Sequence, residues 1–166
     1  MNYLTVPLTL AHKIKDFSCG KELLDNYLHT QAKQDVKKKL AACFILAGDQ
    51  DIIKGYYTLS ASSIPRNLVP DEMKKKLPPA YVNLPITLLG RLAVDKIFHG
   101  QKLGELLLLD ALKRSYDTST TIGSMAVIVD PIDADAERFY AKYEFIYLPG
   151  SGRQFIMMDT VVDLFK

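Results

Sequence analysis

The chain has 166 residues, a formal net charge of +2 and 48% hydrophobic residues. This length and apolar content predict a single domain, residues 1–166, with a substantial core. The small net charge neither requires nor excludes an RNA partner. No apolar run approaches bilayer-spanning length, and the amino terminus lacks the basic start and cleavage site of a signal peptide. A cytoplasmic protein is therefore expected.

Cysteine and histidine spacing gives no sign of a metal site or a structural disulfide. Cys19 and Cys43 lie far apart without CxxC spacing, so each is expected to be a reduced, partly buried side chain. His12, His29 and His99 are scattered and lack the paired spacing of metal ligands. The sequence therefore predicts no metal cofactor.

The first half of the chain carries local signals for a helix, a strand and one long connection. Asp16 or Ser18 is placed to cap a helix, and Tyr56-Tyr57 is typical of a strand. The segment from Asn67 to Pro85 contains four prolines and is predicted to be irregular. It is either a plain surface connection or a wall on the acceptor side of a binding site.

Lysines gather in two triplets, residues 37–39 and 74–76. Each triplet alone is typical of a solvated helix face. If both lay on one side of the fold, they would form a footprint for a phosphate backbone. The sequence leaves both readings open.

A strand, a turn and a helix follow one another in the middle of the chain. Leu88 to Val94 predicts an apolar strand, His99 to Gly104 a polar turn, and Leu103 to Tyr116 a helix whose Leu103, Leu106 and Leu107 face inward. Such a turn directs free backbone N–H groups, reinforced by the helix dipole, toward one point. It is therefore a candidate phosphate site.

The remaining elements complete an α/β pattern. The apolar run 124–129 is typical of a strand buried on both faces, as in a parallel pair. A helix is expected from Asp133 to Tyr143, and strands from Phe145 to Leu148 and from Phe155 to Thr160. Strand, helix and strand form a right-handed crossover, and ligands bind at the carboxyl ends of such strands.

The stretch RLAVDKIFHGQKLGELLL, followed by DADAERFYAKYEF, resembles the GNAT acetyltransferase superfamily, which binds acetyl-CoA. The family's loop reads Gln or Arg, two residues, Gly, one residue, then Gly or Ala. Here His99 takes the first place, Lys102 replaces the first glycine and Gly104 matches, while the usual Gly-Phe ending of the later helix reads Glu144-Phe145. The resemblance covers nearly the whole chain. It implies an α/β GNAT fold, with a mixed, mostly antiparallel sheet, flanking helices, and parallel fourth and fifth strands that splay apart.

The resemblance also implies the cofactor-binding residues. Backbone groups of residues 92–94 would align acetyl-CoA and polarise its carbonyl, and loop amides from Gln101 to Glu105 would hold its phosphates. Lys102 would cost about 1–2 kcal/mol in a left-handed turn, while its ammonium meets the pyrophosphate. Asp133 would touch the pantetheine arm or cap the helix. The complete implied set is Leu92, Ala93, Val94, His99, Gly100, Gln101, Lys102, Leu103, Gly104, Glu105 and Asp133.

Tyr140 is the catalytic residue that the resemblance implies. A phenol, with an ordinary pKa of about 10, is protonated at neutral pH and can donate to a departing thiolate. From the residues alone, a core aromatic is the favoured interpretation of Tyr140, because Ala136, Phe139, Tyr140 and Tyr143 form one helical stripe. Tyr143 on the same stripe is the fallback acid.

Three segments of the first half, residues 16–20, 24–28 and 55–60, resemble the GNAT toxins of bacterial toxin–antitoxin pairs. Those toxins acetylate the amino group of aminoacyl-tRNA and block translation. The resemblance thus implies aminoacyl-tRNA as substrate, a small DNA-binding antitoxin, and a homodimer in which Phe155 to Phe165 pack in a shared edge. The alternatives are a GNAT enzyme for a small-molecule or peptide amine, and a binding protein that lost catalysis, as the departures at His99, Lys102 and Glu144 suggest.

Overall fold

The computed structural model describes residues 2–166, which group into two compact units. The first comprises the described residues up to Ser60 together with Leu89–Arg114. The second comprises Ala61–Leu88 together with Ser115–Lys166. Strands β3 (Ile53–Pro65) and β4 (Asn83–Val94) and helix α4 (Leu103–Ser119) contribute residues to both units.

One sheet contains seven strands in the order β1-β2-β3-β4-β5-β7-β6. Strands β4 and β5 run parallel, whereas β1–β2, β2–β3, β5–β7 and β6–β7 are antiparallel pairs. The predicted mixed sheet with parallel fourth and fifth strands is confirmed. The remaining strands are β1 (Val6–Pro7), β2 (Ala42–Ala47), β5 (Ala126–Val129), β6 (Ile146–Leu148) and β7 (Arg153–Met157).

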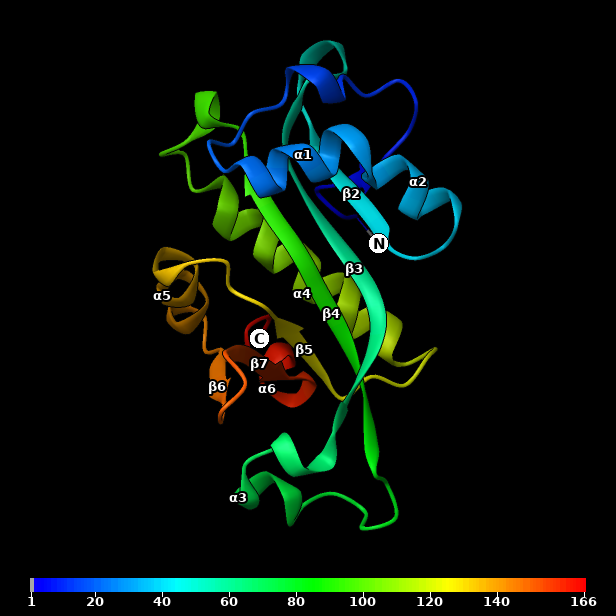
Figure 1. Ribbon diagram of the computed structural model, residues 1–166, viewed down its shortest axis with the longest axis vertical. Coiled ribbons are helices and arrows are strands. Elements are labelled where there is room, and N and C mark those ends of the chain that lie inside the picture. The colour runs from blue at the N-terminus through cyan, green and yellow to red at the C-terminus, as the bar shows by residue number, and fades with distance from the viewer. Residues whose placement is uncertain (1) are drawn as a thin grey trace. The chain divides into compact units, whose positions relative to one another are not determined.

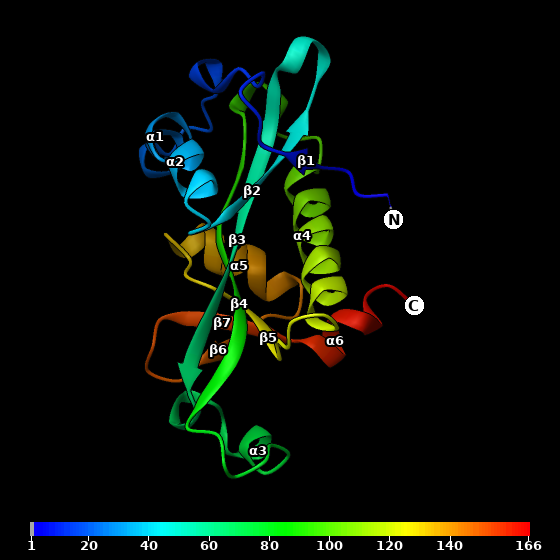
Figure 2. The same ribbon diagram turned by 90° about the vertical axis from the view of Figure 1, so that its right-hand side faces the viewer.

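Helices flank the strands (Figure 1). In the first unit, α1 and α2 lie on one face of β2–β4 and α4 covers the opposite face (Figure 2). The other helices are α1 (Glu22–Thr30), α2 (Ala32–Lys37), α3 (Asp71–Lys74), α5 (Ala134–Lys142) and α6 (Met158–Asp163). Short 3-10 turns occupy Ile14–Asp16, Asp49–Asp51, Arg66–Leu68 and Lys96–Phe98.

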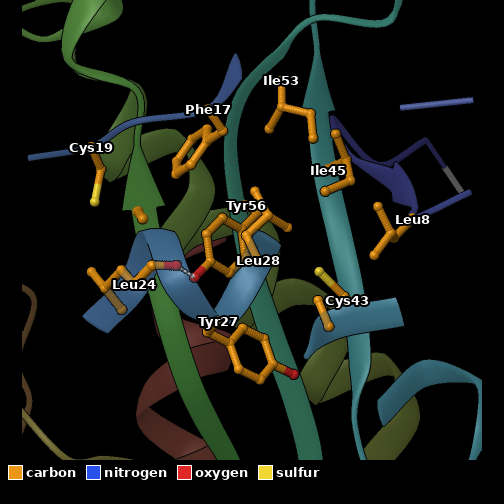
Figure 3. Packing of buried hydrophobic residues seen from close by; sticks show 12 residues of the cluster. Leu8, Phe17, Cys19, Leu24, Tyr27, Leu28, Cys43, Ile45, Ile53 and Tyr56 are labelled. Carbon is orange, nitrogen blue, oxygen red and sulfur yellow. Dashed lines mark hydrogen bonds between the residues drawn. The ribbon is translucent and has the colours of Figure 1, made fainter. Parts of the chain in front are cut away.

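Two neighbouring tyrosines of β3 connect the sheet to both helix layers, because successive strand residues point to opposite faces. Tyr56 donates a 2.7 Å hydrogen bond to the Leu24 carbonyl of α1 and packs edge-on against Phe17 (Figure 3). Tyr57 donates a 2.7 Å bond to Asp110 of α4. Both rings are fully buried, so this strand is the centre of the first unit's core.

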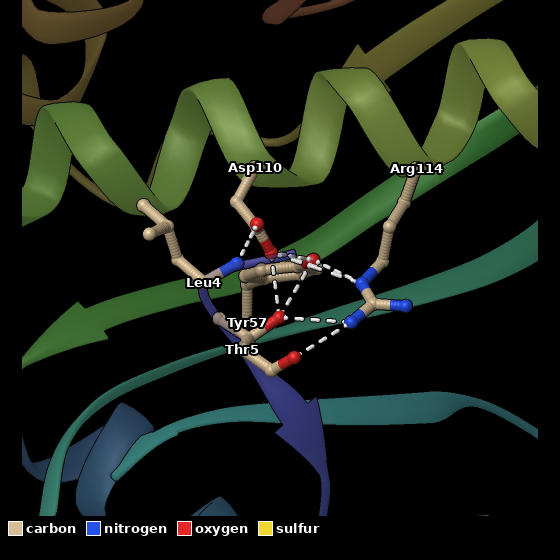
Figure 4. Close-up of polar contacts among 5 residues, drawn as sticks. All are labelled: Leu4, Thr5, Tyr57, Asp110 and Arg114. Carbon is tan, nitrogen blue, oxygen red and sulfur yellow. Dashed lines mark hydrogen bonds and ion pairs between the residues drawn. The ribbon is translucent and has the colours of Figure 1, made fainter. Parts of the chain in front are cut away.

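The carboxylate of Asp110 is buried at the α4 face and has a complete set of donors (Figure 4). It accepts hydrogen bonds from Leu4 N at 2.7 Å, Thr5 Oγ1 at 2.5 Å and the Tyr57 hydroxyl at 2.7 Å. Arg114 Nε donates to the Tyr57 hydroxyl and its Nη2 to the Thr5 carbonyl. A buried charge is tolerated only with such partners, so this network fixes the amino-terminal segment against α4.

The second unit has its own core around β5. All four β5 residues are buried, as expected for a strand covered on both faces. Strand β7 pairs with β5 from Ala126↔Met157 to Val129↔Gln154. The buried cluster here comprises Ile64, Val69, Leu84, Ile86, Ala126, Ile128, Leu148 and Phe155.

The structure corrects the predicted end of the last strand. Strand β7 ends at Met157, and Met158 begins α6 instead of continuing to Thr160. The register with β5 ends at Ala126↔Met157, and one further bond runs from Met158 N–H to the Met125 carbonyl. The chain then continues as a helix that buries Met158 and Val161 on one side. Strand β7 lies between β5 and β6 in the sheet, and the dimer contact through residues 155–165 stays a prediction.

Three further expectations are wrong in detail. The segment 67–85 is not wholly irregular, since it includes α3 and the start of β4. Neither Asp16 nor Ser18 caps α1, which begins at Glu22 after Lys21. Leu106 does not face inward but is 40% exposed, because it lies on the solvent side of α4 while Leu107 is buried.

Within residues 2–166, no helix is long and apolar enough to cross a membrane.

We predict that Asp110→Asn lowers the free energy of unfolding by about 2–4 kcal/mol. The substitution keeps the side-chain shape but directs an NH2 group at donors, which leaves buried N–H or O–H groups unpaired. Urea denaturation measures the change. Asp130→Asn is the matched control, because Asp130 pairs with Arg153 at the surface, where an ion pair contributes about 0–1 kcal/mol. Equal losses of unfolding free energy in the two variants would contradict the conclusion that the buried Asp110 network stabilises the fold more than a surface ion pair does.

Candidate active site

A buried carboxylate holds the turn that follows β4. Asp95 is 5% exposed and accepts hydrogen bonds from Ile97 N at 2.9 Å and Ser18 N at 3.0 Å. Its own N–H donates to the Lys54 carbonyl of β3. Asp95 therefore ends the strand, caps the 3-10 turn Lys96–Phe98 and fixes the loop before α1.

The predicted phosphate loop contains two residues with left-handed backbone. Gly100 and Lys102 both have positive φ, +81° and +59°, just before α4 begins. Alternating right- and left-handed residues make successive N–H groups converge. Lys102 thus adopts the left-handed conformation that a glycine takes in the family pattern, at a cost of about 1–2 kcal/mol.

His99, which replaces Gln or Arg of the family pattern, contacts the strand. Its Nε2 lies 2.7 Å from the Val94 carbonyl oxygen. A carbonyl only accepts, so Nε2 carries the proton and donates. The exposed imidazole therefore joins the end of β4 to the turn, a role that orients the backbone around it.

Close packing brings β4 and the first turns of α4 together over a glycine. A Cβ at Gly55 of β3 would lie 2.7 Å from Leu107 Cδ1 and 2.8 Å from the Ala93 carbonyl oxygen. Both distances are shorter than any real Cβ contact, so only glycine fits here. The glycine of the segment 55–60 thus sets how near α4 approaches the strand residues predicted to meet the cofactor.

Helix α5 ends in a Schellman motif that contains Tyr140. Glu144 has φ +70°, and its N–H donates to the Ala141 carbonyl, while Phe145 N–H donates to the Tyr140 carbonyl. The hydrophobic contact of the motif joins the Tyr140 and Phe145 rings, whose centroids are 5.2 Å apart. The Glu144-Phe145 pair therefore holds the tyrosine ring, and Glu144 occupies a position that favours glycine.

Tyr140 is buried, with 8% of its surface exposed, and Phe139 packs on its ring at 5.3 Å. Burial raises the pKa of its hydroxyl well above the ordinary value. At the other end of α5, Asp133 Oδ1 accepts a 2.8 Å bond from Ala136 N. Asp133 thus takes the capping role that the sequence allowed, and a pantetheine contact stays a prediction.

The predicted site residues fall in both units. Residues 92–94 and 99–105 lie together in the first unit, at the end of β4 and the start of α4. Asp133 and Tyr140 lie in the second unit, at opposite ends of α5. Tyr143 follows α5 as its C-cap residue, with its ring 5.2 Å from Phe139.

Sequence reasoning missed one charged residue beside these groups. Arg91 on β4 places its guanidinium carbon 3.6 Å from the centroid of the Tyr27 ring of α1. The Tyr27 hydroxyl in turn donates a 2.9 Å bond to Asp35 of α2. A cation inside an otherwise apolar strand was the available signal, but its partner lies 64 positions earlier in the sequence.

Each lysine triplet lies at the carboxyl end of a short helix. Lys37 ends α2, and Lys74 ends α3. Cations are favourable there because they meet the negative end of the helix dipole. The triplets belong to different units, so a shared phosphate footprint stays a prediction.

Neither thiol has the properties of a nucleophile. Cys19 and Cys43 are free and buried. Burial raises the pKa of Cys19 to about 11 and that of Cys43 to about 12, so both remain protonated at neutral pH. Among residues 2–166, no group of His, Cys, Asp and Glu is arranged to hold a metal ion.

Known proteins resemble the chain along most of its length. No protein-family model matches it. A tRNA-acetylating toxin of Mycobacterium tuberculosis is 31% identical over 139 residues, which cover 84% of this chain and 81% of the relative.

Solved structures match the whole fold. A tyrosine-to-phenylalanine variant of KacT superposes with a TM-score of 0.90 at 29% identity, covering 96% of this chain and 97% of that one. AtaT complexed with acetyl-methionyl-tRNAfMet gives 0.89 at 29% identity and covers 98% of both chains. AtaTR bound with AcCoA gives 0.86 at 30% identity, covering 98% and 97%.

We predict that Lys102→Gly and Glu144→Gly each raise the free energy of unfolding by about 0.5–1 kcal/mol. Each relieves a left-handed strain of about 1–2 kcal/mol and adds about 0.5–1 kcal/mol of unfolded-chain entropy. Denaturant titration measures both. Glu137→Gly inside α5 is the control of opposite sign, with an expected loss of about 1 kcal/mol. A loss at position 102 or 144 would show that the lysine or glutamate side chain stabilises its turn.

Proposed function

This chain belongs to the family of tRNA-acetylating GNAT toxins, and we propose that it transfers the acetyl group of acetyl-CoA to the amino group of aminoacyl-tRNA. Acetylation removes the nucleophile that peptide-bond formation needs, so translation is blocked. The observation that carries the proposal is the 31% identity to a tRNA-acetylating toxin over 84% of the chain. The similarity to AtaT complexed with acetyl-methionyl-tRNAfMet supports the same substrate class.

Acetyl-CoA fits the turn that precedes α4. The positive φ angles of Gly100 and Lys102 direct the N–H groups of residues 101–105 toward one point. The amino-terminal end of α4 adds its dipole, and the Lys102 ammonium adds a full charge for the pyrophosphate. The relative AtaTR, solved with AcCoA bound, supports this cosubstrate.

The end of β4 is assigned to the acetyl thioester. When bound, acetyl-CoA supplies an activated acetyl group whose sulfur is the leaving atom. Backbone groups of Leu92, Ala93 and Val94 align the thioester and polarise its carbonyl. His99 acts on this segment indirectly, because its hydrogen bond to the Val94 carbonyl fixes the strand end relative to the phosphate turn.

Tyr140 is assigned as the proton donor to the leaving sulfur. Because burial raises the pKa of its hydroxyl, the phenol keeps its proton at neutral pH. A phenol with a raised pKa is a weak acid in water, but the same desolvation raises the proton affinity of a thiolate beside it. The Schellman contact with Phe145 holds the ring in place for this transfer.

The acceptor amine needs little help to lose its proton. A free α-amine has a pKa of about 7.7–8.0, so a useful neutral fraction exists at pH 7, whereas a lysine amine at about 10.4 is almost wholly protonated. This difference favours an aminoacyl ester over a protein lysine as acceptor. It fits the predicted set of site residues, in which no carboxylate is assigned as a general base.

An antitoxin partner follows from the same family. The AtaT–AtaR complex bound to DNA superposes with a TM-score of 0.79 at 26% identity over 98% of this chain. We infer a small DNA-binding antitoxin that covers the toxin's site. We also propose a cytoplasmic location, where aminoacyl-tRNA is made and used, and a single GNAT domain over residues 1–166.

The structure weakens the argument that the chain is a catalytically inactive binding protein. That alternative rested on His99, Lys102 and Glu144 in place of family residues. Lys102 and Glu144 nevertheless adopt left-handed backbone, and His99 bonds to the strand end. The turn and the end of α5 therefore keep defined geometries despite the substitutions.

We predict that Tyr140→Phe lowers kcat for acetyl transfer by about 10²–10⁴-fold. The change removes one hydroxyl and retains the ring packing; relatives KacT and AtaT have been solved as variants of the same kind. Transfer of label from acetyl-CoA to a bulk aminoacylated tRNA pool measures the rate, and Tyr143→Phe is the matched control. Loss in Tyr143→Phe alone would assign the acid to Tyr143. No labelled tRNA from wild-type protein that binds acetyl-CoA would redirect the search to small amines.

We predict that kcat/KM for aminoacyl-tRNA rises with pH until the α-amine is neutral, near pH 8, and then stays level up to about pH 10. A general acid works below its pKa and fails above it. Since burial moves the pKa of Tyr140 upward from about 10, its falling limb lies beyond this range. Initial rates in short assays give the profile. A decline beginning near pH 8 would exclude Tyr140 as the acid.

A further inference from the structure

Arg91 lies on the face of the sheet that α1 covers. Strand residues two apart share a face, and Ala93 packs in the buried cluster with Tyr27 and Tyr56. Arg91 is therefore on the α1 side, consistent with its contact to the Tyr27 ring. Helix α4 covers the opposite face of these strands (Figure 2), and the phosphate turn leads directly into its first residue.

The platform under Arg91 is rigid. Its guanidinium carbon is 3.6 Å from the Tyr27 ring centroid, which is stacking distance. Tyr27 is 5% exposed, its hydroxyl is bonded to Asp35, and its ring stacks at 6.4 Å on Tyr56. The guanidinium is thus held in one plane before any ligand arrives.

The donors of Arg91 have no hydrogen-bond or ion-pair partner among the described residues. Among residues 2–166, no carboxylate forms an ion pair with the Arg91 guanidinium and no acceptor takes a hydrogen bond from it. The side chain is partly buried, so water solvates its charge and its N–H donors only incompletely. Stacking occupies the face of the guanidinium and leaves its edge N–H groups in the plane, the geometry for bidentate binding of an oxyanion.

The acceptor substrate is the source of that oxyanion. The phosphates of acetyl-CoA are assigned to the turn at residues 100–105, at the start of the helix on the other face. The carboxyl group of an aminoacyl-tRNA is esterified, so its nearest anionic groups are the phosphodiesters of the acceptor strand. We propose that Arg91 binds a backbone phosphate of the aminoacyl-tRNA acceptor end through a bidentate pair of hydrogen bonds. This inference rests on the proposed function.

The test compares two acceptors that share an α-amine. Arg91→Gln is assayed with aminoacyl-tRNA and with an amino acid methyl ester, which carries no phosphate. We expect KM for aminoacyl-tRNA to rise about tenfold to hundredfold, as for a lost charge-assisted hydrogen bond. The rate with the ester and KM for acetyl-CoA are expected to stay within about twofold. The salt dependence of KM for aminoacyl-tRNA should correspond to about one phosphate contact fewer.

Two further variants make the result decisive. Arg91→Lys keeps the charge without the planar fork, and we expect it to restore only part of the lost affinity. It also serves if Arg91→Gln does not fold, as judged by thermal melting. Lys166→Gln removes one exposed positive charge at the carboxyl terminus and is expected to leave KM for aminoacyl-tRNA unchanged, which controls for net charge.

Several outcomes would overturn the proposal. Equal losses with aminoacyl-tRNA and the methyl ester would assign Arg91 a structural role. Full activity of Arg91→Gln and Arg91→Lys on aminoacyl-tRNA would exclude the contact while leaving the proposed function intact. Loss of antitoxin binding with unchanged KM for aminoacyl-tRNA would give Arg91 to the protein partner. If wild-type protein does not acetylate aminoacyl-tRNA, the proposed function itself fails first.

Discussion

The hydrogen bonds of one buried carboxylate, Asp95, determine where the functional segments of the first unit lie. They end β4, start the turn that leads into α4, and hold Ser18 in the loop before α1. The predicted thioester segment, the phosphate turn and the helix that carries Tyr27 are therefore tied to a single side chain. One oxygen bonds to Ile97 N and the other to Ser18 N, which lies 77 positions before Asp95 in sequence. Displacing the carboxylate would therefore disturb the turn after β4 and the loop before α1 together.

Backbone handedness explains both departures from the family glycines. Lys102 and Glu144 stand where the chain is left-handed, one in the phosphate turn and one in the Schellman motif after α5. The side chains at the two positions have different surroundings. At 102 a cation faces the expected pyrophosphate, whereas Glu144 is exposed and forms part of no described site. Function thus offers a reason for the strain at Lys102 and gives none at Glu144.

Local pattern was enough to predict the segment from β4 to α5, because periodicity, turn residues and the cap at Asp133 are short-range signals. Local pattern failed where contacts with residues distant in sequence determine the structure. The last strand stops at Met157 because the chain continues there as α6, which buries Met158 and Val161 against the rest of the fold. Likewise, the Arg91–Tyr27 stack and the donors of Asp110 join residues that no spacing rule connects. The roles of Tyr140 and Asp133 toward acetyl-CoA came from family resemblance. They remain predictions, and the Tyr140→Phe variant tests the first of them.

The Asp110 network also bears on how the protein is made. Leu4 and Thr5 are bonded to side chains of α4 across 105 to 109 positions of sequence. A ribosome adds residues one by one, so these bonds form only after most of the chain has been synthesised and α4 has left the exit tunnel. Contacts between such distant segments close late in folding. The nascent chain therefore completes its amino-terminal anchor only late in its own synthesis.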